Sequence, residues 1–170
     1  MRRFNKAAFL DRDGVINKNY GYVHSLDNFV WLKNVKKAIK YLNDKNYKVI
    51  VISNQSGVAR KLFTEKDVTK LHKWMNSELK KINAKIDKFY FCPFHPKYGS
   101  KYYKKKSNLR KPNPGMLLKA IKKYNIEKEK SFMIGDTNSD QICAKRAKIK
   151  FFFKKNNLLK DIKKIIKIKK

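Results

Sequence analysis

The chain has 170 residues, of which 42% are hydrophobic and 13% aromatic, so it can bury a hydrophobic core without disulfides. No apolar run approaches the roughly 20 residues that cross a bilayer, and Asp11 interrupts the first apolar run too early for a secretory signal. Two cysteines, Cys92 and Cys143, give no disulfide framework and fit a reducing compartment. We therefore expect a cytoplasmic protein with no membrane partner.

The charge is strongly positive, with 44 Lys and Arg against 13 Asp and Glu and a formal net charge of +31. Such a surface can attract a polyanion such as nucleic acid. A recognition face, however, favours arginine and clusters its charges, whereas here the lysines are scattered from Lys33 to Lys170. We interpret the charge as drift of composition and do not expect a nucleic-acid partner, although a polyanion partner for this surface stays open.

Strands and helices alternate along the chain. Runs of apolar, β-branched or aromatic residues, each bounded by turn residues, predict five buried strands. These are residues 7–10, 48–53, 86–92, 131–135 and 149–153. The alternation favours an α/β fold, a right-handed doubly wound parallel sheet in three layers that forms one domain over residues 1–170.

Amphipathic helices are predicted between the strands. Asn34 caps the first, which ends near Asn46, and Thr64 caps the second with Asp67 at the capping-box position. A third begins at Pro114 after a loop of unusual length. The remaining helices are expected around residues 142–147 and at 157–170, where the apolar face of the last helix packs on the domain.

Isolated aromatic and sulfur side chains are given structural interpretations. His24 and His72 have no metal ligand at a suitable spacing and are taken as loop and surface histidines. Trp31 and Trp74 are interpreted as packing groups, and Cys143 as a small buried residue within a helix.

The segment FLDRDGVIN, residues 9–17, places two carboxylates where the first strand ends and the chain turns at Gly14. In a parallel sheet, side chains at this end open into the ligand crevice. One of these carboxylates could attack a substrate covalently while the other exchanges protons with the leaving and entering oxygens. Because acidic turns are common, this segment alone also fits a simple polar turn.

Further polar groups follow the other strands and should meet the carboxylates at one edge of the sheet. They are Ser53 and Asn54, Asp136 and Asp140, and Arg110 and Lys111 from the long loop. Mg²⁺ binds carboxylates and phosphate oxygens, and Asp11 with Asp136 can supply the former. Ser53 can hold phosphate oxygens while Lys111 neutralises charge on a transferring group. The set suits phosphoryl transfer to a carboxylate.

Four segments, FLDRDGVIN, SNQSGVAR, RKPNPGM and MIGDTNSD, resemble the signature motifs of the haloacid-dehalogenase (HAD) superfamily of phosphatases. With GYVHSLDNFVW, they are most similar to the D-glycero-D-manno-heptose 1,7-bisphosphate phosphatase family, with histidinol-phosphate phosphatases nearest to it. The resemblance covers about residues 4–153. It implies a HAD-like, Rossmannoid domain with a minimal cap, and a Mg²⁺-dependent phosphomonoesterase acting through an aspartyl phosphate. We expect a monomer, although neither the motifs nor the composition determines the oligomeric state.

The implied substrate is a small phosphorylated sugar, most specifically the heptose bisphosphate, on the way to cell-surface sugar such as lipopolysaccharide precursors. Histidinol phosphate and the 3′-phosphate of a nucleic acid are alternatives, and a polyanion-binding protein without catalysis is disfavoured because every catalytic position is filled. The exact substrate, its anomer and the oligomeric state are not decided by the sequence.

The resemblance also implies roles for individual residues. Asp11 is the nucleophile and Asp13 the general acid and base. Mg²⁺ is held by Asp11, Asp136 and the backbone carbonyl of Asp13. Ser53 and Lys111 are expected to bind the transferring phosphate. Asn54 and Arg110 are expected to recognise the substrate, with Arg110 binding the phosphate that is not cleaved. The residues expected to lie along the sugar are Asn19, Tyr20, Gly21 and Tyr22.

The sequence departs from the family in the long loop, which in relatives often holds a structural zinc through a Cys-x-His and a Cys-x-Cys pair. Here the first pair reads Cys92-Pro93-Phe94, with the histidine displaced to His95, and the second is replaced by residues 107–109, Ser-Asn-Leu. A closed zinc site needs four ligands. We expect no structural zinc, and a loop that is either ordered by its aromatics, Phe94, Tyr98, Tyr102 and Tyr103, or mobile without substrate.

Overall fold

The computed structural model describes residues 4–155 and 157–168, and a five-stranded sheet lies at its centre. The strand order is β3-β2-β1-β4-β5, and every neighbouring pair is parallel. The strands are β1 Lys6–Leu10, β2 Tyr47–Asn54, β3 Lys88–Cys92, β4 Phe132–Gly135 and β5 Lys150–Phe153. All five predicted strands are therefore present, with bounds shifted by one or two residues.

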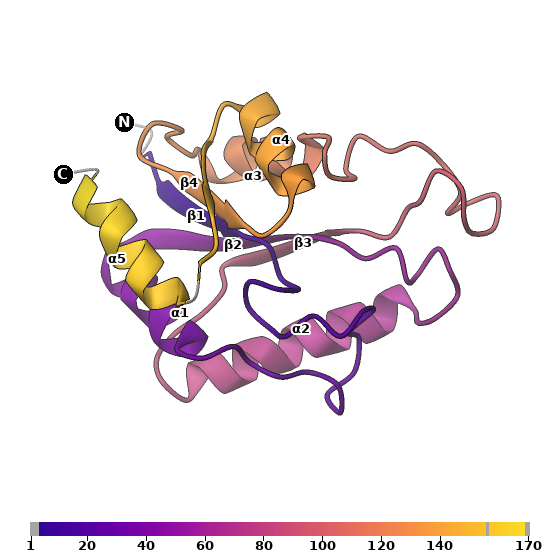
Figure 1. Cartoon of the computed structure of the whole chain (residues 1–170), viewed down its shortest axis with the longest axis horizontal. Coiled ribbons are helices and arrows are strands. Elements are labelled where there is room, and N and C mark those ends of the chain that lie inside the picture. The colour runs from indigo at the N-terminus through magenta and orange to yellow at the C-terminus, as the bar shows by residue number, and fades with distance from the viewer. Residues whose placement is uncertain (1–3, 156, 169–170) are drawn as a thin grey trace.

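Helices cover both faces of the sheet. They are α1 Val35–Asp44, α2 Glu65–Lys80, α3 Gly115–Tyr124, α4 Asn138–Ala147 and α5 Leu158–Ile168. Helices α3 and α4 lie on one face, and α1, α2 and α5 lie on the other (Figure 1). The predicted doubly wound, three-layer α/β architecture is confirmed. None of the helices in the described ranges has the length and apolar character needed to cross a membrane.

Alternation along the strands builds a separate core on each face. In β1, Ala7 and Phe9 pack with the α3 and α4 layer, whereas Ala8 and Leu10 pack with the α1, α2 and α5 layer. This is the period of two expected for a strand whose two faces are both covered. The apolar side of α5 joins the second core through buried Leu158, Ile162 and Ile165, as predicted.

One predicted helix cap is confirmed in full, and the other is confirmed only in its position, since Asn34 is the N-cap residue of α1. Thr64 and Asp67 form the predicted capping box at the start of α2. Asn34, by contrast, has a left-handed backbone with φ of 63°, and its side chain forms no cap hydrogen bond. Asn tolerates this conformation, and here it lies in a turn closed by Val35 N–H donating to the Leu32 carbonyl at 3.2 Å.

The placement of His72 on the surface is wrong. His72 is only 5% exposed, and its ring stacks on Phe89 with centroids 4.2 Å apart and planes 12° apart. Helix α2 lies across the sheet (Figure 1), so the residue beside Leu71 faces β3 instead of solvent. Trp31 and Trp74 pack against Phe29 as expected.

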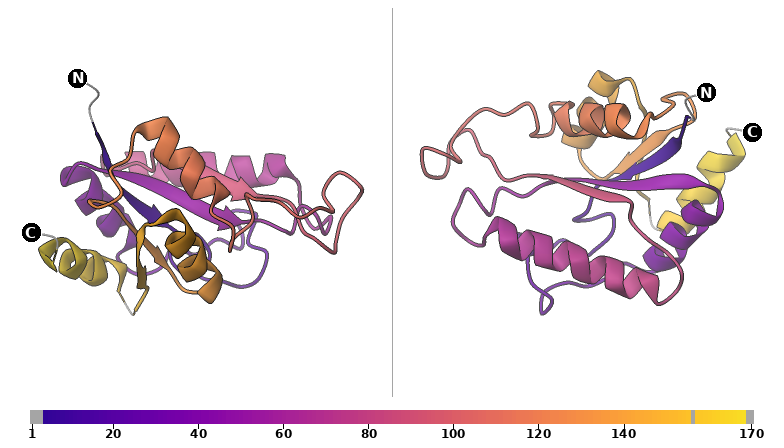
Figure 2. Two further views of the ribbon diagram at one scale, coloured as in Figure 1. Left: turned by 90° about the horizontal axis from the view of Figure 1, so that it is seen from above. Right: turned by 180° about the vertical axis from the view of Figure 1, so that it is seen from behind.

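The long loop between β3 and α3 extends beyond the sheet (Figure 2). Its aromatic side chains contact one another, in line with the first of the two alternatives above: Phe94 packs against Tyr102 and Tyr103 with ring centroids 6.1 and 6.2 Å away. The Tyr103 hydroxyl donates to a Glu65 carboxylate oxygen at 2.9 Å, which fastens the loop to the start of α2.

Candidate active site

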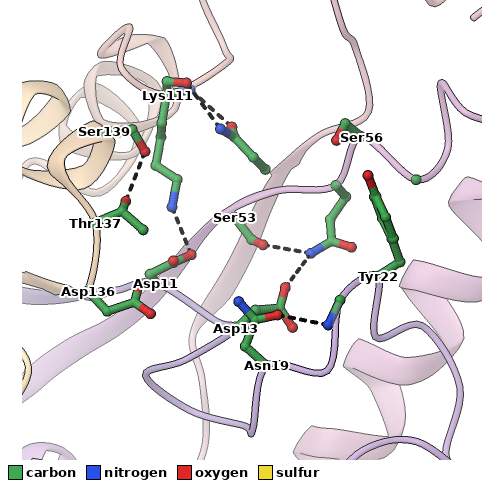
Figure 3. Close-up of a pocket in the computed structure, with 14 residues that line it drawn as sticks. Asp11, Asp13, Asn19, Tyr22, Ser53, Ser56, Lys111, Asp136, Thr137 and Ser139 are labelled. Carbon is green, nitrogen blue, oxygen red and sulfur yellow. Dashed lines mark hydrogen bonds and ion pairs between the residues drawn. The ribbon is translucent and has the colours of Figure 1, made fainter. Parts of the chain in front are cut away.

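The carboxyl ends of β1, β2 and β4 surround a pocket of about 430 Å³. The side chains around it point inward from segments far apart in sequence (Figure 3). Those predicted to form the site that do line it are Asp11, Asp13, Asn19, Gly21, Tyr22, Ser53, Asn54, Lys111 and Asp136. The sheet therefore brings together nearly all of the predicted residues.

Asp11 lies directly after β1 at the base of this pocket. Its backbone N–H donates to the Ile134 carbonyl at 3.0 Å, which continues the pairing with β4. Its carboxylate lies 2.7 Å from Lys111 Nζ (Figure 3). Burial raises the pKa of Asp11 to about 7, because the attraction of Lys111 does not fully offset desolvation and the repulsion of Asp140. Asp11 thus needs positive charge nearby to remain an anion.

Lys111 provides part of that charge from a buried position. Its Nζ lies 2.7 Å from Asp11 and 2.6 Å from Asp140 and donates to the Ile52 carbonyl at 2.9 Å. Burial alone would lower the pKa of Lys111, but the two carboxylates raise it, so it stays protonated. Asn54 fixes the backbone, donating to the Lys111 carbonyl at 3.1 Å and accepting from its N–H at 3.0 Å. Asn54 therefore positions Lys111 as well as lining the pocket.

Asp13 is held by a group that the sequence analysis did not single out. Arg12 is fully buried, and its Nη2 donates to the two Asp13 carboxylate oxygens at 2.9 and 3.0 Å. Asn17 Nδ2 and Gln55 Nε2 donate to the same carboxylate at 2.9 and 3.0 Å. Gln55 also donates to Ser53 Oγ at 2.7 Å, linking the two strand ends. These contacts fix Asp13 at the mouth of the pocket.

Asp11 and two further carboxylates form a candidate cation site. Oxygens of Asp11, Asp136 and Asp140 lie within 4.8 Å of one another in the described chain. Asp140 is engaged by Lys111 and by the Thr137 cap of α4, whereas Asp136 is exposed. Although Asp136 is exposed as a residue, partial desolvation of its carboxylate and, second, the charge of Asp140 raise its pKa. Hard oxygen ligands with excess negative charge are what Mg²⁺ prefers, so the residues fit that ion.

Gly14 allows Asp136 to approach the first strand end. Its φ is +86°, and a Cβ at this position would lie 1.9 Å from Asp136 Oδ2. The turn after Asp13 therefore accepts only glycine without moving Asp136.

Two predicted residues do not line this pocket. Tyr20 is 60% exposed, and Arg110 is partly buried within the long loop, where its Nη1 donates to the Phe94 carbonyl at 3.3 Å. Residues that line the pocket but were not predicted are Gln55, Ser56, Gly57, Thr137 and Ser139. All five lie within three residues after a predicted strand-end residue, Asn54 or Asp136, so their position in the turn was the signal available in the sequence.

Comparisons with solved structures identify the class of protein that has this fold and pocket. A solved HAD-superfamily hydrolase from Ehrlichia chaffeensis shares the fold at 16% identity, with a TM-score of 0.59 over 99% of this chain and 98% of that chain. D,D-heptose 1,7-bisphosphate phosphatase from B. bronchiseptica, solved with magnesium and phosphate, matches at 28% identity and a TM-score of 0.79, covering 92% and 84%. The protein is a phosphatase of the HAD superfamily.

Sequence comparisons narrow this class. The profile of the family described as polynucleotide kinase 3 phosphatase matches residues 6–164. D-glycero-beta-D-manno-heptose-1,7-bisphosphate 7-phosphatase from Rhodopseudomonas palustris is 46% identical over 146 residues, which cover 86% of this chain and 81% of that protein. The chain belongs to the D-glycero-D-manno-heptose 1,7-bisphosphate 7-phosphatase family, and the predicted resemblance is confirmed.

Proposed function

We propose that this phosphatase removes the 7-phosphate of D-glycero-D-manno-heptose 1,7-bisphosphate, with Asp11 as nucleophile. The observation that carries the proposal is the buried contact of Asp11 with Lys111 at 2.7 Å, which keeps an anion and a cation together at the base of a polar pocket. The name of the Rhodopseudomonas palustris relative supports the substrate.

In the proposed reaction, an Asp11 carboxylate oxygen attacks phosphorus, the bond to the sugar oxygen breaks, and Asp13 gives that oxygen its proton. Asp13 then takes a proton from water, whose oxygen attacks the aspartyl phosphate and releases inorganic phosphate and the Asp11 carboxylate. Lys111 and Ser53 stabilise the charge on the transferring group. The hydrogen bonds from Arg12 and Gln55 to Asp13 support this assignment, because they orient its carboxylate.

Asp11, Asp136 and the backbone carbonyl of Asp13 are the residues proposed to hold Mg²⁺. When bound, the ion neutralises negative charge so that an anionic carboxylate and an anionic phosphate can approach each other. Two findings support the assignment: the cluster of carboxylates in this chain and the magnesium in the B. bronchiseptica enzyme.

The sugar is proposed to lie along Asn19, Gly21 and Tyr22, which line the pocket. In Figure 3, Tyr22 lies on the side opposite Asp136. Tyr20 stands outside this wall, and Arg110 is proposed to reach the phosphate that is not cleaved. We further propose that the chain acts as a cytoplasmic monomer with a single domain. Cys92 and Cys143 are free and buried, which is consistent with a reducing compartment.

A second candidate is a nucleic-acid 3′-phosphatase. The description of the matching family profile and the net charge of +31 favour it, since a basic surface attracts phosphodiester chains. The two candidates share the same nucleophile and differ in what the outer part of the pocket must accept.

Phosphate release from a panel of substrates tests the proposal. The panel contains both anomers of the heptose bisphosphate, histidinol phosphate and a 3′-phosphorylated oligonucleotide, each with and without Mg²⁺. We expect the heptose bisphosphate with Mg²⁺ to be the best substrate, and faster release from the oligonucleotide would favour the second candidate. Asp11→Asn should lose more than about 10⁴-fold of kcat, whereas Asp44→Asn, the same change on exposed helix α1, should retain full activity.

A further inference from the structure

Arg60 does not line the pocket itself but contacts two residues that do, Ser56 and Tyr22, and it has no assigned role. It belongs to the turn after β2, where its N–H donates to the carbonyl of Ser56 at 3.1 Å, and Ser56 lines the pocket across from Asp136 (Figure 3). The long loop packs on this turn, because a Cβ on Gly99, whose φ is +111°, would lie 2.9 Å from the Ala59 carbonyl oxygen. Two segments of the chain thus build the rim around Arg60.

Two tyrosines hold the Arg60 guanidinium. Its Cζ lies 3.7 Å from the ring centroid of Tyr98 in the long loop and 5.8 Å from that of Tyr22, which lines the pocket. Stacking on an aromatic ring orients the flat guanidinium while its edge remains available for hydrogen bonds. The arrangement therefore prepares a cation beside the wall proposed to contact the sugar.

This cation has no acidic partner in the described part of the chain. None of the ion pairs formed there involves Arg60 or Arg110, and Arg60 Nε is covered without a hydrogen-bond partner among the described residues. Burial and the charge of Arg60 both lower the pKa of Arg110, and burial, Arg110 and Arg60 lower that of His95. The rim thus gathers like charges that repel one another, and a bound anion would relieve this repulsion.

We propose that Arg60, stacked on Tyr98, binds the phosphate of the substrate that is not transferred and so selects bisphosphates over monophosphates. The inference rests on the proposed function, because the active site at Asp11 must bind the other phosphate. Arg60 would act with Arg110, and a planar guanidinium suits this task because it can donate two parallel hydrogen bonds to one phosphate.

The test compares two substrates that differ only in the second phosphate: the heptose 1,7-bisphosphate and the heptose 7-phosphate. The quantity measured is the ratio of their kcat/KM values. Arg60→Gln should lower this ratio by about 10- to 100-fold, the range expected for lost hydrogen bonds to a charged group, mainly through KM for the bisphosphate. Arg60→Lys keeps the charge without the planar fork and should restore part of the ratio.

Lys61→Asn is the matched control. It removes a positive charge from the neighbouring exposed residue, whose φ of 62° asparagine accepts, and it should leave the ratio unchanged. If Arg60→Gln does not fold, as judged by circular dichroism, Tyr98→Leu removes the stacking platform instead and should also lower the ratio.

The outcomes separate the two proposals. A wild-type enzyme that hydrolyses the bisphosphate, with an unchanged ratio in folded Arg60→Gln, overturns the role of Arg60 and leaves the proposed function intact. A wild-type enzyme that hydrolyses neither heptose substrate overturns the proposed function and this inference with it. An equal loss with Lys61→Asn would attribute the effect to general surface charge and would likewise overturn the specific site.

Discussion

Acidification tests the burial of His72 through the stability of the fold. The pKa of His72 is lowered from 6.5 to about 3, first by burial and second by the charge of Arg12. Below pH 6.5 the unfolded chain therefore binds a proton that the folded protein excludes. By linkage, stability is lost as pH falls from 6.5 toward 3, by about 1.4 kcal/mol for each pH unit.

The expected loss can be worked out for a practical pH interval. Between pH 7 and pH 5, His72 alone should lower the free energy of unfolding by about 2 kcal/mol, because the unfolded histidine is almost fully protonated at pH 5. Other groups also titrate in this interval, Asp11 among them. The contribution of His72 is therefore isolated as the difference between the wild type and His72→Phe, which keeps an aromatic ring against Phe89.

Urea unfolding at pH 7 and pH 5, followed by circular dichroism, measures both proteins. We expect the wild type to lose about 2 kcal/mol more than His72→Phe over this interval. Both transitions must be reversible and two-state at each pH for the comparison to hold. Equal pH dependence in the two proteins would mean that His72 is protonated in the folded state, and the argument from burial and stacking would be refuted.

Three further predictions concern the first strand end, the last helix and the long loop. Gly14→Ala should lose most phosphatase activity, with KM and kcat measured at saturating Mg²⁺, because its Cβ would displace Asp136; activity equal to wild type would contradict that crowding. Ile162→Ala should lower the free energy of unfolding by about 2 to 5 kcal/mol, since Ile162 is fully buried, and a loss below about 1 kcal/mol in urea unfolding would mean that α5 is not packed as described. Elemental analysis of purified protein should find no stoichiometric zinc, and zinc retained by the wild type but lost in Cys92→Ser would contradict this.

Site residues could be predicted from the sequence when their place in the site follows only from their position at the end of a strand. Asp11 and Ser53 each close an apolar run, and parallel strands present such ends at one edge. Arg12 could not be found in this way, because a lone arginine between two aspartates reads as a surface residue. Its burial depends on Asp13, Gln55 and the carbonyl of Val23, which accepts a hydrogen bond from Nη2, and only the folded chain brings these groups together.

Asn54 illustrates the same limit from another direction. Its position after β2 indicates a polar group at the ligand edge, and it does line the pocket. Its two hydrogen bonds, however, go to the backbone of Lys111, 57 residues away. The sequence pattern predicts the position of Asn54 at the end of a strand. Its hydrogen-bond partner, in contrast, depends on where the long loop returns to the sheet. Asn54 therefore supports the backbone of Lys111 in addition to its proposed contact with substrate.

Charge balance explains why the pocket requires a second cation. Among the described residues, Asp11, Asp136 and Asp140 are accompanied by one buried lysine, Lys111, which contacts Asp11 and Asp140. Desolvation is the first cause of the raised pKa values of Asp11 and Asp136, and the excess negative charge adds to it. A phosphate approaching this arrangement would add to the repulsion. Binding of a divalent cation would remove it and would favour the anionic form of Asp11, the proposed nucleophile. The same carboxylates that weaken phosphate binding without metal thus create the affinity for the ion, so metal and phosphate should bind with positive coupling.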